Sequence, residues 1–133
     1  MTPQEMKGLV RRLEAAGIEG DVGELDDHPG YWQMRQVMPR LRRAFPDMRT
    51  SLQRQVVEGD TVASFSILSG THLGRFMGIP PTGRRVTFQH VTIDRVRDGR
   101  VIEHNGESGW LGVLVELGVL PRRDGDGGRP AAP

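Results

Sequence analysis

The second half of the sequence contains two runs of alternating apolar and polar residues, and each run is interrupted by a turn that contains glycine. The first run, SLQRQVVEGDTVASFSILSGTHLG, divides at EGD, and the second, RVTFQHVTIDRVRDGRVIEHN, divides at Asp98-Gly99. Alternation is typical of a strand with one buried face. A glycine turn between two such runs indicates a β-hairpin. The sequence therefore predicts two antiparallel hairpins after residue 50.

The first half has helical rather than strand periodicity. Thr2, Pro3 and Glu5 form a helix-start signal, and Met6, Leu9, Val10 and Leu13 follow at helical spacing, with Gly17 as the expected stop. A second helix is expected within residues 31–45, either kinked at Pro39 or starting near it. Residues 20–30 are interpreted as an acidic loop, and residues 109–117 as a short helix. Helices followed by antiparallel strands favour an α+β fold, with helices on one face of a curved sheet.

Composition limits the classes of function. The 133 residues suit one domain, which we place at residues 1–121, and the Arg/Gly/Pro-rich tail 122–133 is expected to be disordered. The net charge of +1 gives no strong field toward nucleic acid or membrane, so neither is expected as a partner. The absence of cysteine excludes disulfides and thiol catalysis. Without a signal peptide or an apolar run near 18 residues, a cytoplasmic location is expected.

The register of the second hairpin decides which side chains share a face. A two-residue turn at Asp98-Gly99 would place Asp94 opposite Glu103, and like charges in that position are destabilising. We therefore expect a three-residue loop that begins at Arg97. This loop would pair Thr92 with His104.

One face of this hairpin carries the candidate catalytic groups. With this register, strand alternation places Phe88, His90, Thr92 and His104 on one face. His90 and His104 are candidates for acid/base catalysis near neutral pH, or they are hydrogen-bonded residues that only shape a pocket. Glu107, beyond the strand, is a further candidate acid, or an ordinary carboxylate at a helix start. No metal site is expected, because neither HxH nor HxxxH occurs and Asp94 would be a distant third ligand.

Aromatic and charged residues elsewhere have simpler interpretations. Asp27, His28 and Tyr31 are expected in a solvated turn, although they could line a cavity entrance. Trp32 and Trp110 are interpreted as core or interface anchors.

The stretch GTHLGRFMGIPPTGRRVTF, followed by DRVRDGRVIEH and WLGVLVELG, resembles the SnoaL-like polyketide cyclases over residues 41–121. The resemblance implies an NTF2-like cone, in which a curved antiparallel sheet has helices packed on its concave face around one pocket. It also implies a homodimer formed through the sheet, no cofactor, and a small hydrophobic polyketide-like substrate. The residues expected to contact that substrate are Thr92, Phe88, Trp32, Val37, Leu41 and Trp110.

The resemblance also places the catalytic positions of the family's aldol cyclases on this chain. Their acid/base aspartate falls on Gly106, a pocket histidine on Thr92, a pocket glutamine on His90 and a pocket asparagine near Val37. Many broader members carry a further aspartate where this chain has Gly109. Glycine cannot transfer a proton, so the aldol cyclase mechanism cannot be carried over unchanged.

Three functions follow from these residues. The first is a cofactor-independent cyclase or isomerase of a polyketide-like natural-product intermediate, in which His104, His90 or Glu107 acts as acid/base or the pocket acts by shape. The second is a non-catalytic module that binds a hydrophobic ligand or stabilises a partner enzyme. The third is the opening or closure of an epoxide ring with Asp94, Glu103 and Glu107.

Overall fold

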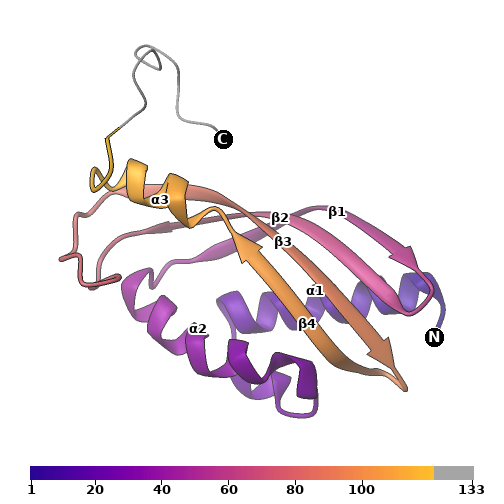
Figure 1. The fold of residues 1–133 in the computed structure, drawn as a ribbon. Helices are drawn as coiled ribbons and strands as arrows, with labels where there is room; N and C mark the ends of the chain where they lie inside the picture. The colour runs from indigo at the N-terminus through magenta and orange to yellow at the C-terminus, as the bar shows by residue number, and fades with distance from the viewer. Residues whose placement is uncertain (122–133) are drawn as a thin grey trace.

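A four-stranded antiparallel sheet forms the centre of the structure, which is a computed structural model that describes residues 1–121 (Figure 1). The strands follow chain order across the sheet: β1 (Arg49–Glu58), β2 (Thr61–Thr71), β3 (Arg85–Arg97) and β4 (Arg100–Ser108). The helices are α1 (Pro3–Glu19), α2 (Trp32–Ala44) and α3 (Trp110–Glu116), with short 3₁₀ helices η1 (Val22–Leu25) and η2 (Pro29–Tyr31) between α1 and α2. Both expected hairpins are present, and the expected loop at 20–30 contains η1 and the start of η2.

Helix α1 begins at the predicted signal but runs further than expected. The Glu5 amide donates to Thr2 Oγ1 at 3.1 Å, and the Thr2 amide donates to Glu5 Oε1 at 2.9 Å, which completes a capping box. The expected stop at Gly17 is wrong, because the helix continues to Glu19. A Cβ at position 17 would lie 2.4 Å from Met34 Cε. Gly17 therefore leaves room for the Met34 side chain of α2 against α1.

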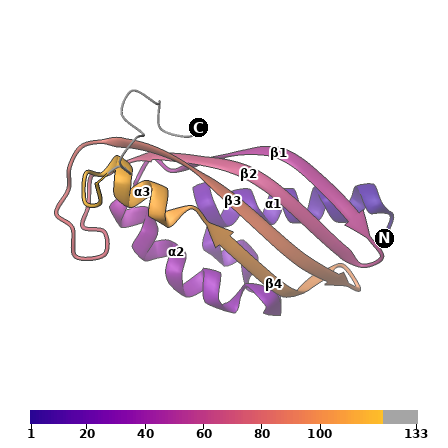
Figure 2. The same cartoon turned by 45° about the horizontal axis from the view of Figure 1, so that its top comes forward.

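Helix α2 is continuous from Trp32 to Ala44 and contains Pro39, so the alternative of a helix start near Pro39 is wrong. Its buried residues are Met34, Met38, Leu41 and Ala44. Helices α1 and α2 lie on the same side of the sheet (Figures 1 and 2).

The core lies between these two helices and the face of the sheet that they cover. Along β3, Val86, Phe88 and Val96 are buried on the covered face, whereas Val91 and Ile93 are exposed on the other. The α+β cone, with helices on the concave face of the sheet, is confirmed. The predicted tail at 122–133 lies outside the described residues. Within residues 1–121, no helix combines the length and apolar character needed to cross a membrane.

Candidate functional site

The register of the β3–β4 hairpin differs from the expected one and thereby creates the site. Arg97 pairs with Arg100 around a two-residue turn, in which Asp98 and Gly99 have φ values of 52° and 74°. The three-residue loop is therefore wrong. Ile102 is a bulged residue, because Arg95 pairs with Glu103 and Val96 with Val101.

The bulge avoids the charge repulsion on which the expected register was based. Arg95, not Asp94, faces Glu103, and Arg95 Nη1 lies 2.9 Å from Glu103 Oε1. Asp94 is instead directly opposite His104 on the concave face. The bulge thus turns an expected distant neighbour of His104 into its partner.

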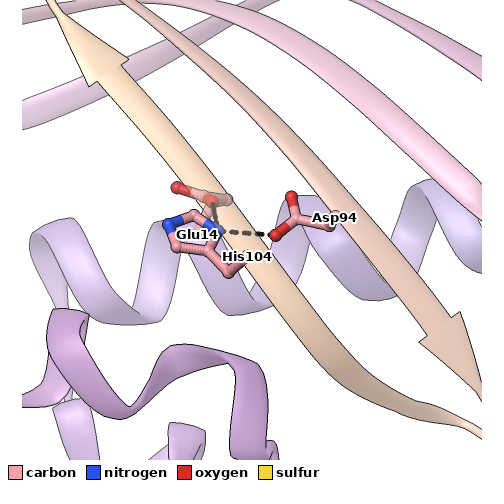
Figure 3. A group of neighbouring side chains, drawn as sticks. All are labelled: Glu14, Asp94 and His104. Atoms are coloured by element: carbon pink, nitrogen blue, oxygen red, sulfur yellow. Dashed lines mark hydrogen bonds and ion pairs between the residues drawn. The ribbon is translucent and has the colours of Figure 1, made fainter.

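Asp94 and His104 form a buried hydrogen-bonded pair, drawn in Figure 3 with Glu14. His104 Nδ1 lies 2.5 Å from Asp94 Oδ1, and the Asp94 side chain is fully buried. Burial raises the pKa of Asp94, and the hydrogen bond and charge of His104 oppose that rise. When Asp94 is ionised, its carboxylate only accepts hydrogen bonds, so Nδ1 carries the proton. The other nitrogen, Nε2, is then free to accept a proton, since no hydrogen bond involves it within residues 1–121. This arrangement orients an imidazole as a general base.

Glu14 is a third charged group at this pair, and it comes from α1. Its Oε1 lies 3.6 Å from His104 Nδ1, and its Oε2 lies 3.7 Å from His90 Nε2. The residue is 8% exposed, and neither oxygen has a hydrogen-bond partner among the described residues. One buried carboxylate therefore lies between the two histidine rings.

The environment of the pair changes its proton affinity. Burial lowers the pKa of His104, but the hydrogen bond and charge of Asp94, together with the charge of Glu14, outweigh burial and raise it above its usual value. Burial, followed by the charges of Asp94 and Glu14, raises the pKa of Tyr31 far above its usual value, so this phenol stays protonated.

Tyr31 and His28 are buried, contrary to the solvated turn expected from the sequence. The ring of Tyr31 lies 4.7 Å from that of His104, centroid to centroid, and is 0% exposed. His28 Nδ1 accepts a hydrogen bond from the Val101 amide at 3.0 Å. A Cβ at Gly30 would lie 2.8–3.0 Å from backbone atoms of Glu103, so the close approach of η2 to β4 requires this glycine. The segment thus fixes the His104 ring from one side.

His90 also faces the concave side, with both ring nitrogens engaged. Its Nδ1 lies 2.7 Å from Ser108 Oγ, and its Nε2 faces Glu14. Strand pairing places His90 opposite Ser108 and Thr92 opposite Gly106.

Gly106 has no side chain to occupy the space between the rings of His90 and His104. A Cβ there would lie 3.3 Å from His104 Nε2, 3.3 Å from His90 Cε1 and 3.6 Å from Thr92 Cγ2. A larger side chain would displace the rings, so glycine at this position provides space for both histidines.

A cavity of about 350 Å³ opens over this part of the sheet. Its lining includes His90, His104 and Ser108 from the sheet together with apolar side chains of α2 and α3, among them Met34, Val37, Met38, Leu41 and Trp110. A second cavity of about 230 Å³ lies between α1 and the sheet and is bordered by Glu14, His90 and Thr92. Glu14 and His90 thus lie near the Asp94–His104 pair and also border the second cavity.

The predicted substrate contacts are distributed unevenly. Val37, Leu41 and Trp110 line the larger cavity, and Thr92 borders the second one. Phe88 is buried behind Trp110, with ring centroids 4.9 Å apart, and does not line either cavity. Trp32 is 56% exposed and lies away from both.

The carboxylates after the bulge do not converge. Glu107 borders the cavity mouth but pairs with exposed Val91, so its side chain starts from the outer face. Glu103 is on the same outer face, paired with Arg95. Only Asp94 of the three carboxylates considered for epoxide chemistry lies on the concave face.

Glu14, Asp94 and His104 are the described residues that could contribute ligands to a metal ion, with one ligand atom each within 4.8 Å of one another. Metal binding would replace the hydrogen bond between His104 Nδ1 and Asp94 Oδ1. The protein thus has one buried group of three side chains that a proton or a cation would stabilise.

Comparison with known proteins places the chain in a family. The family model described as "SnoaL-like polyketide cyclase" matches residues 2–116. The chain belongs to this family. It is 32% identical over 104 residues to nogalonic acid methyl ester cyclase of Streptomyces nogalater, which covers 77% of each chain.

Two further proteins are similar to this chain. Aklanonic acid methyl ester cyclase DauD of Streptomyces sp. strain C5 is 33% identical over 75 residues, which is 56% of this chain and 46% of that protein. The solved structure of AclR from Streptomyces galilaeus superposes with a TM-score of 0.82 at 30% identity, covering 92% of this chain and 86% of AclR.

Sequence reasoning missed Glu14 and undervalued Asp94 and Tyr31. Glu14 lies four residues after Val10 and four before Ile18, so helical periodicity already placed a carboxylate on the buried face of α1. A charged residue on such a face needs a partner or a function, and this was the available signal. For Asp94 no sequence signal existed, because its partner depends on the bulge at Ile102.

Proposed function

We propose that this SnoaL-like protein is a cofactor-independent cyclase that closes a ring of a polyketide-like intermediate by intramolecular aldol chemistry, with His104 as the general base. The observation that carries the proposal is the Asp94–His104 hydrogen bond at 2.5 Å, which leaves Nε2 available beside the cavity. A positioned imidazole of this kind contributes about 10²- to 10⁴-fold to a rate-limiting proton transfer.

The pair compensates for the glycine at the expected aspartate position. The resemblance places the acid/base aspartate of the aldol cyclases at Gly106 and a pocket histidine at Thr92, and these two positions pair directly across β3 and β4. Asp94 and His104 are the next pair on the same face, two residues closer to the turn on each strand. The carboxylate and the imidazole are thus still neighbours, but they have exchanged strands.

The reaction can be followed atom by atom. His104 Nε2 removes a proton from a carbon next to a carbonyl group, and Asp94 stabilises the imidazolium that forms. The resulting enolate attacks a second carbonyl carbon in the same molecule and forms the carbon–carbon bond. The oxygen of that carbonyl receives a proton, so the product is an isomer of the substrate.

The volume and lining of the cavity suit an aromatic or otherwise apolar substrate. Its volume of about 350 Å³ lies at the small end of the range for ligand pockets, about 300–1,000 Å³. Apolar side chains of α2 and α3 face the polar strand β4 across it. The names of two relatives specify methyl esters of nogalonic and aklanonic acid, and we propose a substrate of this class for the present chain.

The test uses those two methyl esters with the wild-type protein and with His104→Gln. The Gln amide can still donate to Asp94, but it cannot accept the substrate proton, so kcat should fall at least about 10²-fold. Binding, followed through Trp110 fluorescence, should change little. Full activity in the variant would refute the role of His104. If the wild type binds the esters without converting them, the result would favour a ligand-binding module. If it neither binds nor converts them, the proposed substrate class would be refuted.

A further inference from the structure

We propose that Ser108 is a second catalytic group, whose hydroxyl donates a hydrogen bond and then its proton to the carbonyl oxygen that becomes the alkoxide during ring closure. In this proposal His90 and Glu14 are positioning residues that orient Ser108 and return its proton. The inference rests on the proposed function, because it assigns the acid for the reaction in which His104 is the base.

The reaction needs such a donor. As the enolate attacks, the π electrons of the second carbonyl move to its oxygen, and a fixed donor at that oxygen stabilises the charge that develops. His104 Nε2 is occupied at this stage by the proton taken from carbon. His104 gains one proton from carbon and His90 loses one through Ser108, so the reaction balances, and exchange of protons with solvent returns both histidines to their starting states.

Ser108 is the polar side chain best placed for this role. It is the last residue of β4, lines the cavity and lies on the same face as Gly106 and His104. The other polar lining residues are directed elsewhere: Asn105 and Glu107 are on outward-facing, exposed positions of β4, and Gln33 is exposed on α2. Ser108 therefore presents its hydroxyl on the concave face, beside His90 Nδ1 and two residues from Gly106.

His90 and Glu14 give this hydroxyl a direction. Glu14 Oε2 lies 3.7 Å from His90 Nε2, and a carboxylate in that position favours a proton on Nε2. The proposed relay requires His90 to carry a second proton on Nδ1, so that Nδ1 donates to Ser108 Oγ, 2.7 Å away, and leaves the hydroxyl hydrogen of Ser108 for the substrate. When Ser108 gives up that hydrogen, Nδ1 replaces it. Glu14 makes no hydrogen bond among the described residues, and its other oxygen, Oε1, lies 3.6 Å from His104 Nδ1.

The distance between the two catalytic groups suits one substrate. Residues 104, 106 and 108 follow one another on the same face, about 6.6 Å apart. The rings of His104 and His90 both lean over Gly106, to within 3.3 Å of where a Cβ would be. A reacting carbon above Gly106 then has the base on one side and the hydroxyl on the other.

The first experiment compares Ser108→Ala with Ser108→Thr in turnover of nogalonic acid methyl ester. We expect Ser108→Ala to lower kcat by about 10²-fold, as for loss of one donor to an oxyanion, with little change in KM. Thr keeps the hydroxyl on a strand position that tolerates branching, so Ser108→Thr should recover most of the activity. Ser51→Ala, at an exposed position of β1, is the matched control and should behave as the wild type.

A double-mutant cycle tests the positioning role of His90. His90→Leu should lower kcat in the wild-type background but cause little further loss in Ser108→Ala, because the two residues act as one unit. Additive losses would overturn the relay. Wild-type kcat in Ser108→Ala, with His104→Gln inactive, would overturn the role of Ser108 and leave the proposed function intact. An acylated Ser108 detected by mass spectrometry would also overturn it, because the residue would then be a nucleophile.

A binding measurement tests Ser108 as a hydrogen-bond donor independently of the proposed cyclase activity. If the wild type converts none of the methyl esters, the substrate class fails, and 4-nitrophenolate then serves as a stable analogue of the oxyanion. Ser108→Ala should weaken its binding by about tenfold, the equivalent of one ordinary hydrogen bond, whereas Ser108→Thr should not. Equal affinity of all three proteins would refute the donor without reference to turnover.

Discussion

Substitution of Asp94 by asparagine is the most direct test of the catalytic pair. Asn has the same shape as Asp, but it has no charge. Its amide can turn either its oxygen or its nitrogen toward His104 Nδ1, so the ring is no longer held with its proton on Nδ1. The side chain at position 94 is fully buried, so no water replaces the lost carboxylate.

The hydrogen bond sets the size of the effect. Bonds to charged groups contribute about 1.5–3 kcal/mol, and each 1.36 kcal/mol corresponds to a factor of ten in rate. Loss of the 2.5 Å bond between His104 and Asp94 should therefore lower kcat/KM by about 10- to 150-fold. Asp98→Asn is the matched control, because Asp98 lies in the exposed turn of the same hairpin and has a positive φ that asparagine tolerates.

The assay is the pH dependence of kcat/KM. His104 acts as a base only when neutral, so activity rises as pH rises through its pKa. Asp94 and Glu14 raise that pKa against the opposing effect of burial. Asp94→Asn removes the charge that raises the pKa of His104, while the opposing effect of burial remains. The pKa of His104 should therefore fall, and the rise in kcat/KM should move to lower pH. The raised pKa of His104 also contributes to the free energy of unfolding. This contribution is fully present below the pKa of His104 in the unfolded state, and it is lost as pH rises through the raised pKa in the folded state.

Two results would refute this reasoning. If Asp94→Asn retains the wild-type kcat/KM, Asp94 does not orient the base. If kcat/KM falls but its acid limb stays in place, the group that titrates is not His104. A loss of secondary structure in the variant, checked by circular dichroism, would call for the smaller change Asp94→Glu, which restores the charge at an altered distance and should restore the position of the limb.

Three further perturbations test the geometry around the pair. Gly106→Ala should lower kcat by roughly tenfold with an almost unchanged Tm, because its Cβ would push both imidazoles by a few tenths of an ångström; unchanged kcat would show that the bare position is not needed. Gly30→Ala should cost about 1–3 kcal/mol in thermal unfolding through overlap with the Glu103 backbone, whereas Gly8→Ala, with open space in an exposed helix, should stabilise by up to about 1 kcal/mol. Ile93→Glu, on the exposed outer face of the sheet, should convert the proposed homodimer into a monomer in sedimentation velocity; a wild-type protein that sediments as a monomer would refute the dimer.

Local periodicity was sufficient to predict the hairpins. The expected three-residue loop placed His104 on the face of His90, and the structure has it there through a two-residue turn and a bulge instead. Strand alternation has a period of two, so the face of each residue within one strand follows once the strand is recognised. Pairing between strands depends on the turn and on bulges, which shift all later pairs. The like-charge argument correctly identified Asp94 opposite Glu103 as unfavourable. It could not choose between a longer loop and a bulge at Ile102, and the structure uses the bulge.

The contribution of α1 to the site depends on packing over a long sequence separation. Glu14 reaches the histidines because α1 crosses the sheet, and Gly17 leaves room for the Met34 side chain of α2 against α1. Neither fact follows from the spacing of residues in α1 alone. The carboxylate on an apolar helix face was nevertheless visible in the sequence, and a buried charge of this kind is stable only when other groups interact with it.

Gly106 can now be understood by what surrounds it. With a carboxylate at position 106, the side chain would begin 3.3 Å from both His104 Nε2 and His90 Cε1, too close for the present ring positions. An aspartate at 106 and the two histidines are thus alternative ways to fill the same space. If the proposed roles hold, reintroducing the acid by Gly106→Asp should lower activity, although it restores the residue expected from the family. A gain of activity in that variant would mean that the site has lost its acid, not exchanged it for the Asp94–His104 pair.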